Sequence, residues 1–136
     1  MKISFTGTQA GMTAAQRERW RSLLMLHKPD AICHGGCVGA DDEADAIAAD
    51  LGILRFVFPS NLEAKRVPNA ILKARTGSQV VVMAEKPPLV RNKDIVLLGD
   101  VLVAAPRQKQ MTVRSGTWAT VRYARKRSVK VEILVP

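Results

Sequence analysis

The sequence has few aromatic residues, few cysteines and no long hydrophobic run. Phe, Trp and Tyr make up only 4% of the chain, so Val, Ile, Leu and Ala must fill any core. Cys33 and Cys37 are too few for a disulfide framework. The apolar runs are short, such as residues 80–84, whereas a membrane span needs roughly 18 apolar residues. The opening segment 1–7 has the pattern of a strand and not of a signal peptide, and we expect a cytoplasmic protein without membrane association.

Length and charge limit the organisation of the chain. Its 136 residues and 47% apolar content fit one domain, residues 1–136, that folds without disulfides. The formal net charge is +9, and from Arg107 onward eight Lys and Arg residues face only Glu132. Such a segment is either a solvated face or an electrostatic footprint for phosphates, and charge alone favours neither.

Short apolar runs alternate along the chain with longer amphipathic ones. The short runs are rich in Val, Ile and Leu without polar alternation, which is typical of strands buried on both faces of a parallel sheet. A Thr13–Gln16 capping box opens the first helix and Pro29 closes it. The sequence therefore predicts a single α/β, Rossmann-like domain, with a mostly parallel sheet flanked by helices. We expect strands at 2–6, 30–34, 54–58, 79–84, 101–105 and 130–135, and further helices at 40–51, 69–75, 89–98 and 116–126.

Loops that follow strands are the candidate binding sites, because ligands of open α/β sheets bind at the carboxyl ends of the strands. The loop after the first strand carries Gly7, Thr8 and Gln9. The loop after the second strand has three glycines in five residues, as phosphate and ribose loops do; they are Gly35, Gly36 and Gly39. Acidic residues then open the next helix: Asp41, Asp42 and Glu43. They repel a phosphate and favour ribose hydroxyls or a base, and the alternative is a glycine turn with acidic capping.

Two later helix starts are also candidates. Arg91 offers a planar fork for phosphate and Asn92 can bridge backbone or sugar groups, although a solvated helix start explains the pair as well. The segment Arg114-Ser115-Gly116-Thr117 enters the last helix with free backbone N–H groups, two hydroxyls and no acid in the first turn. These features indicate an anion site, where the simpler alternative is a Ser or Thr N-cap.

The order of these loops resembles the SLOG superfamily, which groups the Rossmann domain of DNA-processing protein A (DprA/Smf) with the LOG-type phosphoribohydrolases. The resemblance runs from Ile3 to about Val135 and is closer to the DprA-like branch and to small YpsA-related proteins. Arg91-Asn92 resembles the family's R-N motif, and Ser115-Gly116-Thr117 with Thr120 resembles the S-G-S/T-x-x-T turn of DprA. The resemblance implies a pocket for a nucleotide, a nucleotide-derived signal or single-stranded DNA phosphates, and a homodimer.

LOG hydrolases carry a glutamate in their G-G-x-G-T-x-x-E motif, and Thr120 stands at that position here. Without that carboxylate the site has no evident acid or base, unless Asp41 or Asp42 replaces it. We therefore name no catalytic residue and favour a non-enzymatic protein. Cys33, His34 and Cys37 do not supply the four ligands of a zinc site, since only His27 remains elsewhere, and we expect no metal and no cofactor. A structural role is the better interpretation of His34, and for Trp118 packing at a dimer contact is favoured over stacking on a base.

The leading hypothesis is a module that binds a nucleotide or nucleotide-derived small molecule through its Gly-rich and Ser-Gly-Thr loops. Two alternatives stay open. One is a LOG-type phosphoribohydrolase that acts on nucleoside monophosphates. The other is a DprA-like binder of single-stranded nucleic acid, against which the scarcity of aromatic stacking platforms counts.

Overall fold

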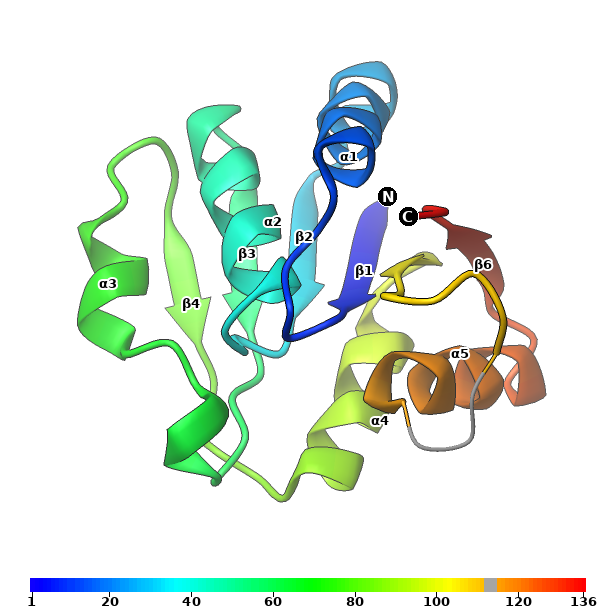
Figure 1. The fold of residues 1–136 in the computed structure, drawn as a ribbon. Helices are drawn as coiled ribbons and strands as arrows, with labels where there is room; N and C mark the ends of the chain where they lie inside the picture. Colours follow the sequence, from blue (N-terminus) through cyan, green and yellow to red (C-terminus); the bar gives the residue numbers. More distant parts are fainter. Residues whose placement is uncertain (112–114) are drawn as a thin grey trace.

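Six short apolar segments form one sheet in which all the described strand pairings are parallel (Figure 1). The computed structural model describes residues 1–111 and 115–136. Its strand order is β4-β3-β2-β1-β5-β6, which confirms the expected single Rossmann-like α/β domain. The strands are β1 (Lys2–Gly7), β2 (Ala31–His34), β3 (Leu54–Val57), β4 (Val80–Val82), β5 (Val101–Ala105) and β6 (Lys130–Ile133).

The helices occur where the amphipathic stretches predict them. The Thr13 hydroxyl accepts a hydrogen bond from the Gln16 amide at 3.1 Å, and the Gln16 side chain accepts one from the Thr13 amide at 2.9 Å, so the capping box is confirmed. The two outer strands are shorter than expected, because their pairing ends at Val82 and at Ile133. The helices are α1 (Ala14–His27), α2 (Ala40–Asp50), α3 (Asn69–Ala74), α4 (Pro88–Leu98) and α5 (Gly116–Lys126), with a short 3₁₀ helix, η1 (Glu63–Lys65).

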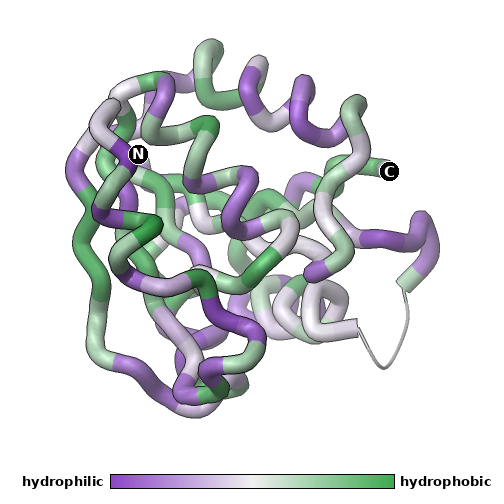
Figure 2. The backbone as a smooth tube through the Cα atoms, turned by 60° about the vertical axis from the view of Figure 1, so that its left-hand side comes forward, coloured by the Kyte–Doolittle hydropathy of each residue, from purple (hydrophilic) through white to green (hydrophobic). Residues whose placement is uncertain are grey.

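Each strand sends alternate side chains to opposite faces, and each face has its own core. On the face covered by α1 and α2, Phe5 packs with Trp20 at a ring separation of 4.8 Å. On the other face, α4 and α5 cover Leu102 and Ala104 of β5. Figure 2 shows green and purple segments alternating along helical turns, as expected for helices with one side on the sheet. In the described part of the chain, no helix has the length and apolar character that crossing a bilayer requires.

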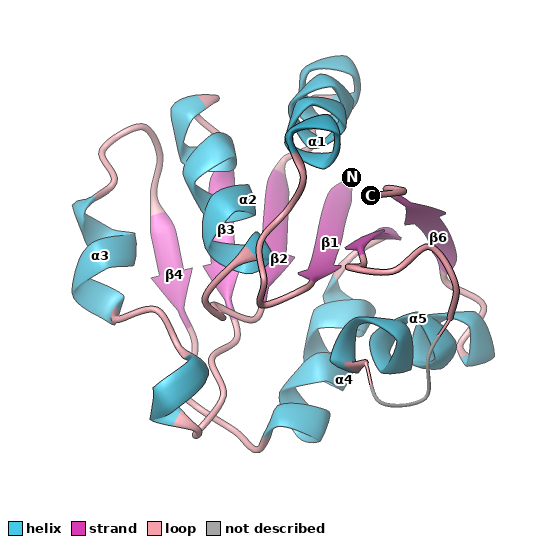
Figure 3. Cartoon of the chain, viewed as in Figure 1, coloured by secondary structure: helices cyan, strands magenta, loops and turns pink. Residues whose placement is uncertain are grey.

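The order in which strands are added to the sheet reverses between β4 and β5. Strands β1 to β4 follow one another towards one edge, and β5 then pairs with the other side of β1. The loops after the arrowheads of the strands gather at one end of the sheet (Figure 3). A crevice is expected where the strand order reverses, since neighbouring connections there go to opposite faces.

Candidate functional site

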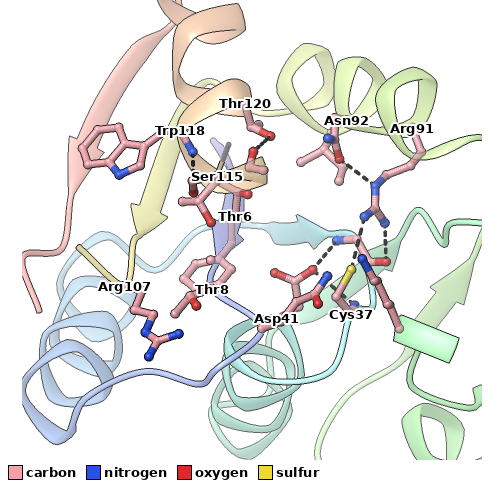
Figure 4. Close-up of a pocket in the computed structure, with 18 of the residues that line it drawn as sticks. Thr6, Thr8, Cys37, Asp41, Arg91, Asn92, Arg107, Ser115, Trp118 and Thr120 are labelled. Carbon is pink, nitrogen blue, oxygen red and sulfur yellow. Dashed lines mark hydrogen bonds between the residues drawn. The ribbon is translucent and has the colours of Figure 1, made fainter. Parts of the chain in front are cut away.

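A cavity of about 590 Å³ lies at the carboxyl ends of the strands, between the starts of α2 and α5 (Figure 4). Residues from both glycine loops, from α4 and from the entry to α5 share its wall. Their part in ligand binding stays a prediction, but the structure brings them to one place. The predicted site residues that line it are Gly7, Thr8, Gln9, Gly35, Asp41, Arg91, Asn92, Ser115, Gly116 and Thr117.

Three predicted site residues are not among these, two because they do not line the cavity and one because the structure does not describe it. Gly36 and Gly39 have φ angles of +65° and +88°, and they shape the turn that carries the lining residues. A Cβ on Gly36 would lie 2.7 Å from a methyl group of Val57. The third, Arg114, lies outside the described residues.

The loop after β1 is tied to the neighbouring elements by backbone hydrogen bonds. The Thr8 amide donates to the Ala105 carbonyl at 3.1 Å, and the Ala40 amide donates to the Thr8 carbonyl at 2.9 Å. Gly7 is needed for this close approach, since a Cβ there would lie 2.5 Å from the Cβ of Ala40. The loop therefore has a fixed position between β5 and the start of α2.

The start of α5 presents unused backbone amides to the cavity. The Ser115 hydroxyl caps the helix by accepting from the Trp118 amide at 3.3 Å. Among the described residues, the amides of Gly116 and Thr117 have no hydrogen-bond partner, and the first turn contains no acid. A Cβ on Gly116 would meet no atom of the described residues within 4 Å. The Ser115 cap and the anion-site geometry coexist, although they were alternatives at the level of sequence.

Arg91 lies at the cavity, but its guanidinium is mostly used by the protein itself. It is 8% exposed, and its Nη1 donates to the carbonyls of Gly35 at 2.7 Å and of Phe58 at 3.1 Å. Its Nη2 donates to the Cys37 sulfur at 3.2 Å, and its Nε donates to the Asn92 side chain at 2.6 Å. The guanidinium therefore holds the glycine turn in place, and few of its N–H groups remain for a phosphate.

The three acids at the start of α2 have different roles in the structure. Asp42 pairs with Arg75 at 2.5 Å, and Glu43 pairs with Arg17 at 3.0 Å, so both are engaged away from the cavity. Only Asp41 lines the cavity. The sequence shows three adjacent acids, whereas the structure places only one of their carboxyl groups, that of Asp41, at the cavity wall.

Asp41 is 5% exposed and only half satisfied. Its Oδ2 accepts hydrogen bonds from the amides of Gly35 at 3.2 Å and Cys37 at 3.3 Å, while its buried Oδ1 has no partner in the described part of the chain. Burial raises the pKa of Asp41, and the charge of Arg91 and the two backbone hydrogen bonds oppose that rise only in part.

Behind the glycine turn lies a buried ionic network centred on Asp45. One carboxylate oxygen contacts His34 at 2.8 Å, and the other contacts Arg55 at 2.6 Å and Arg75 at 2.7 Å. His34 Nδ1 accepts from the Gly36 amide at 2.9 Å, so the proton of the neutral ring lies on Nε2 and points to Asp45. His34 is fully buried and has the structural role that the sequence favours.

Acid should weaken this network. Burial alone would raise the pKa of Asp45, but hydrogen bonds from His34 and Arg75 and the charge of Arg55 outweigh it and lower that pKa from 3.8 to about 2. The stabilisation by Asp45 is therefore fully present above pH 4 and is lost as the pH falls through 2. We expect the stability difference between wild type and Asp45→Asn to shrink by about 2 kcal/mol over this range, as measured by urea unfolding from pH 5 to pH 2. A difference that is constant with pH would contradict this account.

Several lining residues could not be found from the sequence. Lys65 reaches the cavity because η1 packs next to the glycine turn, where the Val38 amide donates to the Lys65 carbonyl. Arg107 follows β5 and belongs to the basic segment, but the sequence did not predict that its side chain lines the cavity. Trp118 of α5 packs into the core beside β5 and also borders the cavity, while the dimer contact expected for it stays a prediction. The remaining unpredicted lining residues are Phe5, Thr6, Cys37, Ile95, Gln108 and Thr120.

The two cysteines and the histidine between them have separate partners. The Cys33 thiol donates to the Ser4 hydroxyl at 3.2 Å, and burial raises its pKa to about 12. Burial and the neighbouring Asp41 charge also raise the pKa of Cys37. Both thiols stay protonated near neutral pH, so neither is an activated nucleophile.

A scan against protein-family models and a search of the curated proteins found no match. Among solved structures, the chain is similar to the molybdenum cofactor binding protein from the phototrophic bacterium Rippkaea orientalis. The TM-score is 0.70 and the sequence identity is 19%, and the match covers 97% of this chain and 74% of the other. The similarity at this identity establishes the fold that the two chains share.

Proposed function

We propose that this protein binds a nucleotide or nucleotide-derived small molecule in the cavity between α2 and α5. A cavity of about 590 Å³ is within the size range of small-molecule sites. It lies at the reversal of strand order, where doubly wound sheets bind nucleotides. The observation that carries the proposal is that both glycine loops, the Arg91–Asn92 segment and the start of α5 face this one space.

The phosphate of the ligand is assigned to the start of α5. The unpartnered amides of Gly116 and Thr117 point their partial positive charge at an anion. Arg107 lines the same cavity and has no ion-pair partner among the described residues (Figure 4). Arg91 contributes at most a second contact, because its guanidinium already binds two carbonyls. The sugar and base then extend towards Thr8 and the turn at 35–41.

Two similarities support a ligand of this class. The order of the loops resembles the SLOG superfamily, whose members include nucleotide-processing and DprA-like domains, and the homodimer implied by that resemblance is part of the proposal. The Rippkaea protein of similar fold is a molybdenum cofactor binding protein. A molybdenum cofactor therefore belongs in the ligand panel beside the nucleotides.

Gly116→Val tests the phosphate position. Gly116 lines the cavity and a Cβ there would meet no described residue within 4 Å, so the bulkier side chain should crowd the anion without straining the helix. We expect an affinity loss of at least about tenfold, roughly 1.4 kcal/mol, with an unchanged melting temperature. Native mass spectrometry of the purified protein identifies a retained ligand and the oligomeric state, and calorimetry with a panel of nucleotides gives the affinities.

The matched control is Ala14→Val. Ala14 is the exposed first residue of α1, as Gly116 is the exposed first residue of α5, but it does not line the cavity. Equal affinities of both variants and the wild type would overturn the phosphate assignment.

A second candidate function is cleavage of the N-glycosidic bond of a nucleoside monophosphate. It is favoured by one observation: Asp41 is a carboxyl at the cavity with a raised pKa, as a general acid requires. Incubation with a panel of nucleoside monophosphates, followed by chromatography for the free base, tests it. If nucleoside monophosphates bind but release no free base, the hydrolase is ruled out and the non-enzymatic proposal stands.

Binding of single-stranded nucleic acid is the third candidate, favoured by the basic segment from Arg107 onward. Its affinity would fall steeply with salt, because each neutralised phosphate releases counterions. A mononucleotide affinity that changes little with salt, together with weak oligonucleotide binding, favours the small-molecule proposal.

A further inference from the structure

Asp41 leaves one hydrogen-bond acceptor unused at the wall of the cavity. Its Oδ1 is buried and has no partner among the described residues, and Asp41 as a whole is only 5% exposed. The protein holds the carboxyl in a fixed position, because Oδ2 accepts hydrogen bonds from two backbone amides of the glycine turn, those of Gly35 and Cys37. An unpaired buried carboxylate oxygen is costly, so native proteins rarely keep one without a purpose.

The neighbouring groups do not satisfy this oxygen. Arg91, which reaches the glycine turn from α4, directs its N–H groups to two carbonyls and to the Cys37 sulfur. His34 directs its Nε2 proton to Asp45 and accepts with Nδ1. Among the residues that the structure describes, none donates to Asp41 Oδ1, so a ligand in the cavity is the available source of a donor.

We propose that Asp41 is a specificity-determining residue, whose Oδ1 accepts a hydrogen bond from an N–H or O–H group of the bound ligand. This inference rests on the proposed function. It adds the kind of chemical group that the ligand presents to the α2 side of the cavity. The donor is an amino or imino group of the base or a ribose hydroxyl. An anionic group at this place is excluded by like-charge repulsion, so the phosphate and the donor lie on opposite sides, as the positions of Ser115 and Asp41 in Figure 4 indicate.

Asp41→Asn provides a sharp variant, because it changes the unused position from acceptor to donor. The amide oxygen keeps the hydrogen bonds from Gly35 and Cys37, so the NH₂ group takes the place of Oδ1. The variant removes a buried charge and preserves the shape of the side chain. Asp42→Asn is the control, since it removes the same charge one residue along the helix, where Asp42 pairs with Arg75 away from the cavity.

The test uses pairs of ligands that differ by one donor. GMP is compared with IMP, AMP with purine riboside monophosphate, and each ribonucleotide with its 2′-deoxy form, so the arms separate a base donor from a ribose hydroxyl. We expect the wild type to prefer the donor-bearing member of one pair by at least about tenfold, because a site built around a hydrogen bond rejects the analogue that lacks it. The preference should disappear in Asp41→Asn and persist in Asp42→Asn.

Stability measurements separate this role from a structural one. Asp41→Asn should melt at the wild-type temperature or above it, because the unfavourable buried charge is gone. A preference that survives in Asp41→Asn, or a wild type that binds nucleotides without distinguishing any pair, would overturn the inference. Failure of the wild type to bind every nucleotide in the panel would instead overturn the proposed function.

Discussion

Asp45→Asn is expected to lower the free energy of unfolding by about 3–5 kcal/mol, because it leaves the buried guanidinium of Arg55 without its counterion. Arg55 and Asp45 are both fully buried, with the charged atoms 2.6 Å apart. Arg75 also contacts the same carboxylate, at 2.7 Å. Since small domains are stable by only about 5–15 kcal/mol, this loss is a large fraction of the total.

Urea unfolding of Asp45→Asn, compared with Asp50→Asn, measures the effect. Asp50 pairs with Arg21 at the surface, where both side chains are largely exposed, so that substitution should cost less than about 1 kcal/mol. Similar stabilities of the two variants would show that the buried network contributes little.

The same substitution should reach the candidate site through His34. Asp45 accepts the Nε2 proton and so leaves Nδ1 free to accept from the Gly36 amide. When the carboxylate is lost, the ring can carry its proton on Nδ1, which then faces another donor. We therefore expect Asp45→Asn to weaken ligand binding even under conditions where the variant remains folded.

Gly39→Ala is expected to destabilise the protein by about 2–5 kcal/mol through backbone strain and overpacking together. Gly39 has φ +88° and ψ −126°, a conformation that side chains rarely permit. A Cβ there would lie 2.3 Å from the backbone oxygen of Gln9. The loop at Thr8–Gln9 would have to move away from α2, so ligand affinity should fall as well.

Gly52→Ala is the control for strain alone. Gly52 also has a positive φ, +74°, but the nearest atom to a new Cβ is 3.9 Å away. It should cost about 1–2 kcal/mol, the usual penalty of a left-handed alanine, and leave binding unchanged. Thermal unfolding and calorimetry of both variants check these outcomes, and equal effects would refute the contact between Gly39 and Gln9.

The local signals in the sequence were sufficient for the fold. Val, Ile and Leu without polar alternation identified strands buried on both faces, and the Thr13 capping box and Ser115 marked helix starts within the chain itself. Two glycine loops that follow strands then indicated a site at one end of the sheet, because the carboxyl ends of parallel strands all lie at that end. These features depend on residues that are close together in the sequence, so they can be recognised from the sequence alone.

Side-chain partners were the part that the sequence did not determine. Arg91 was expected to serve a phosphate, but it binds the carbonyls of Gly35 and Phe58, which only folding brings near. Asp41 and Asp42 are adjacent in sequence and point to different surroundings, since successive helical residues are about 100° apart around the axis. Lys65 arrives through a tertiary contact for which no local motif exists.

The placement of the two tryptophans gives this protein separate optical reporters. Trp20 is fully buried against Phe5 beneath α1, whereas Trp118 belongs to the opposite core and borders the cavity. The emission of one indole therefore reports the integrity of the α1–α2 layer, and that of the other responds to an occupant of the cavity. With so few aromatic side chains, replacing either tryptophan by Phe leaves a single indole, so that unfolding and ligand uptake are expected to be followed separately without an attached dye.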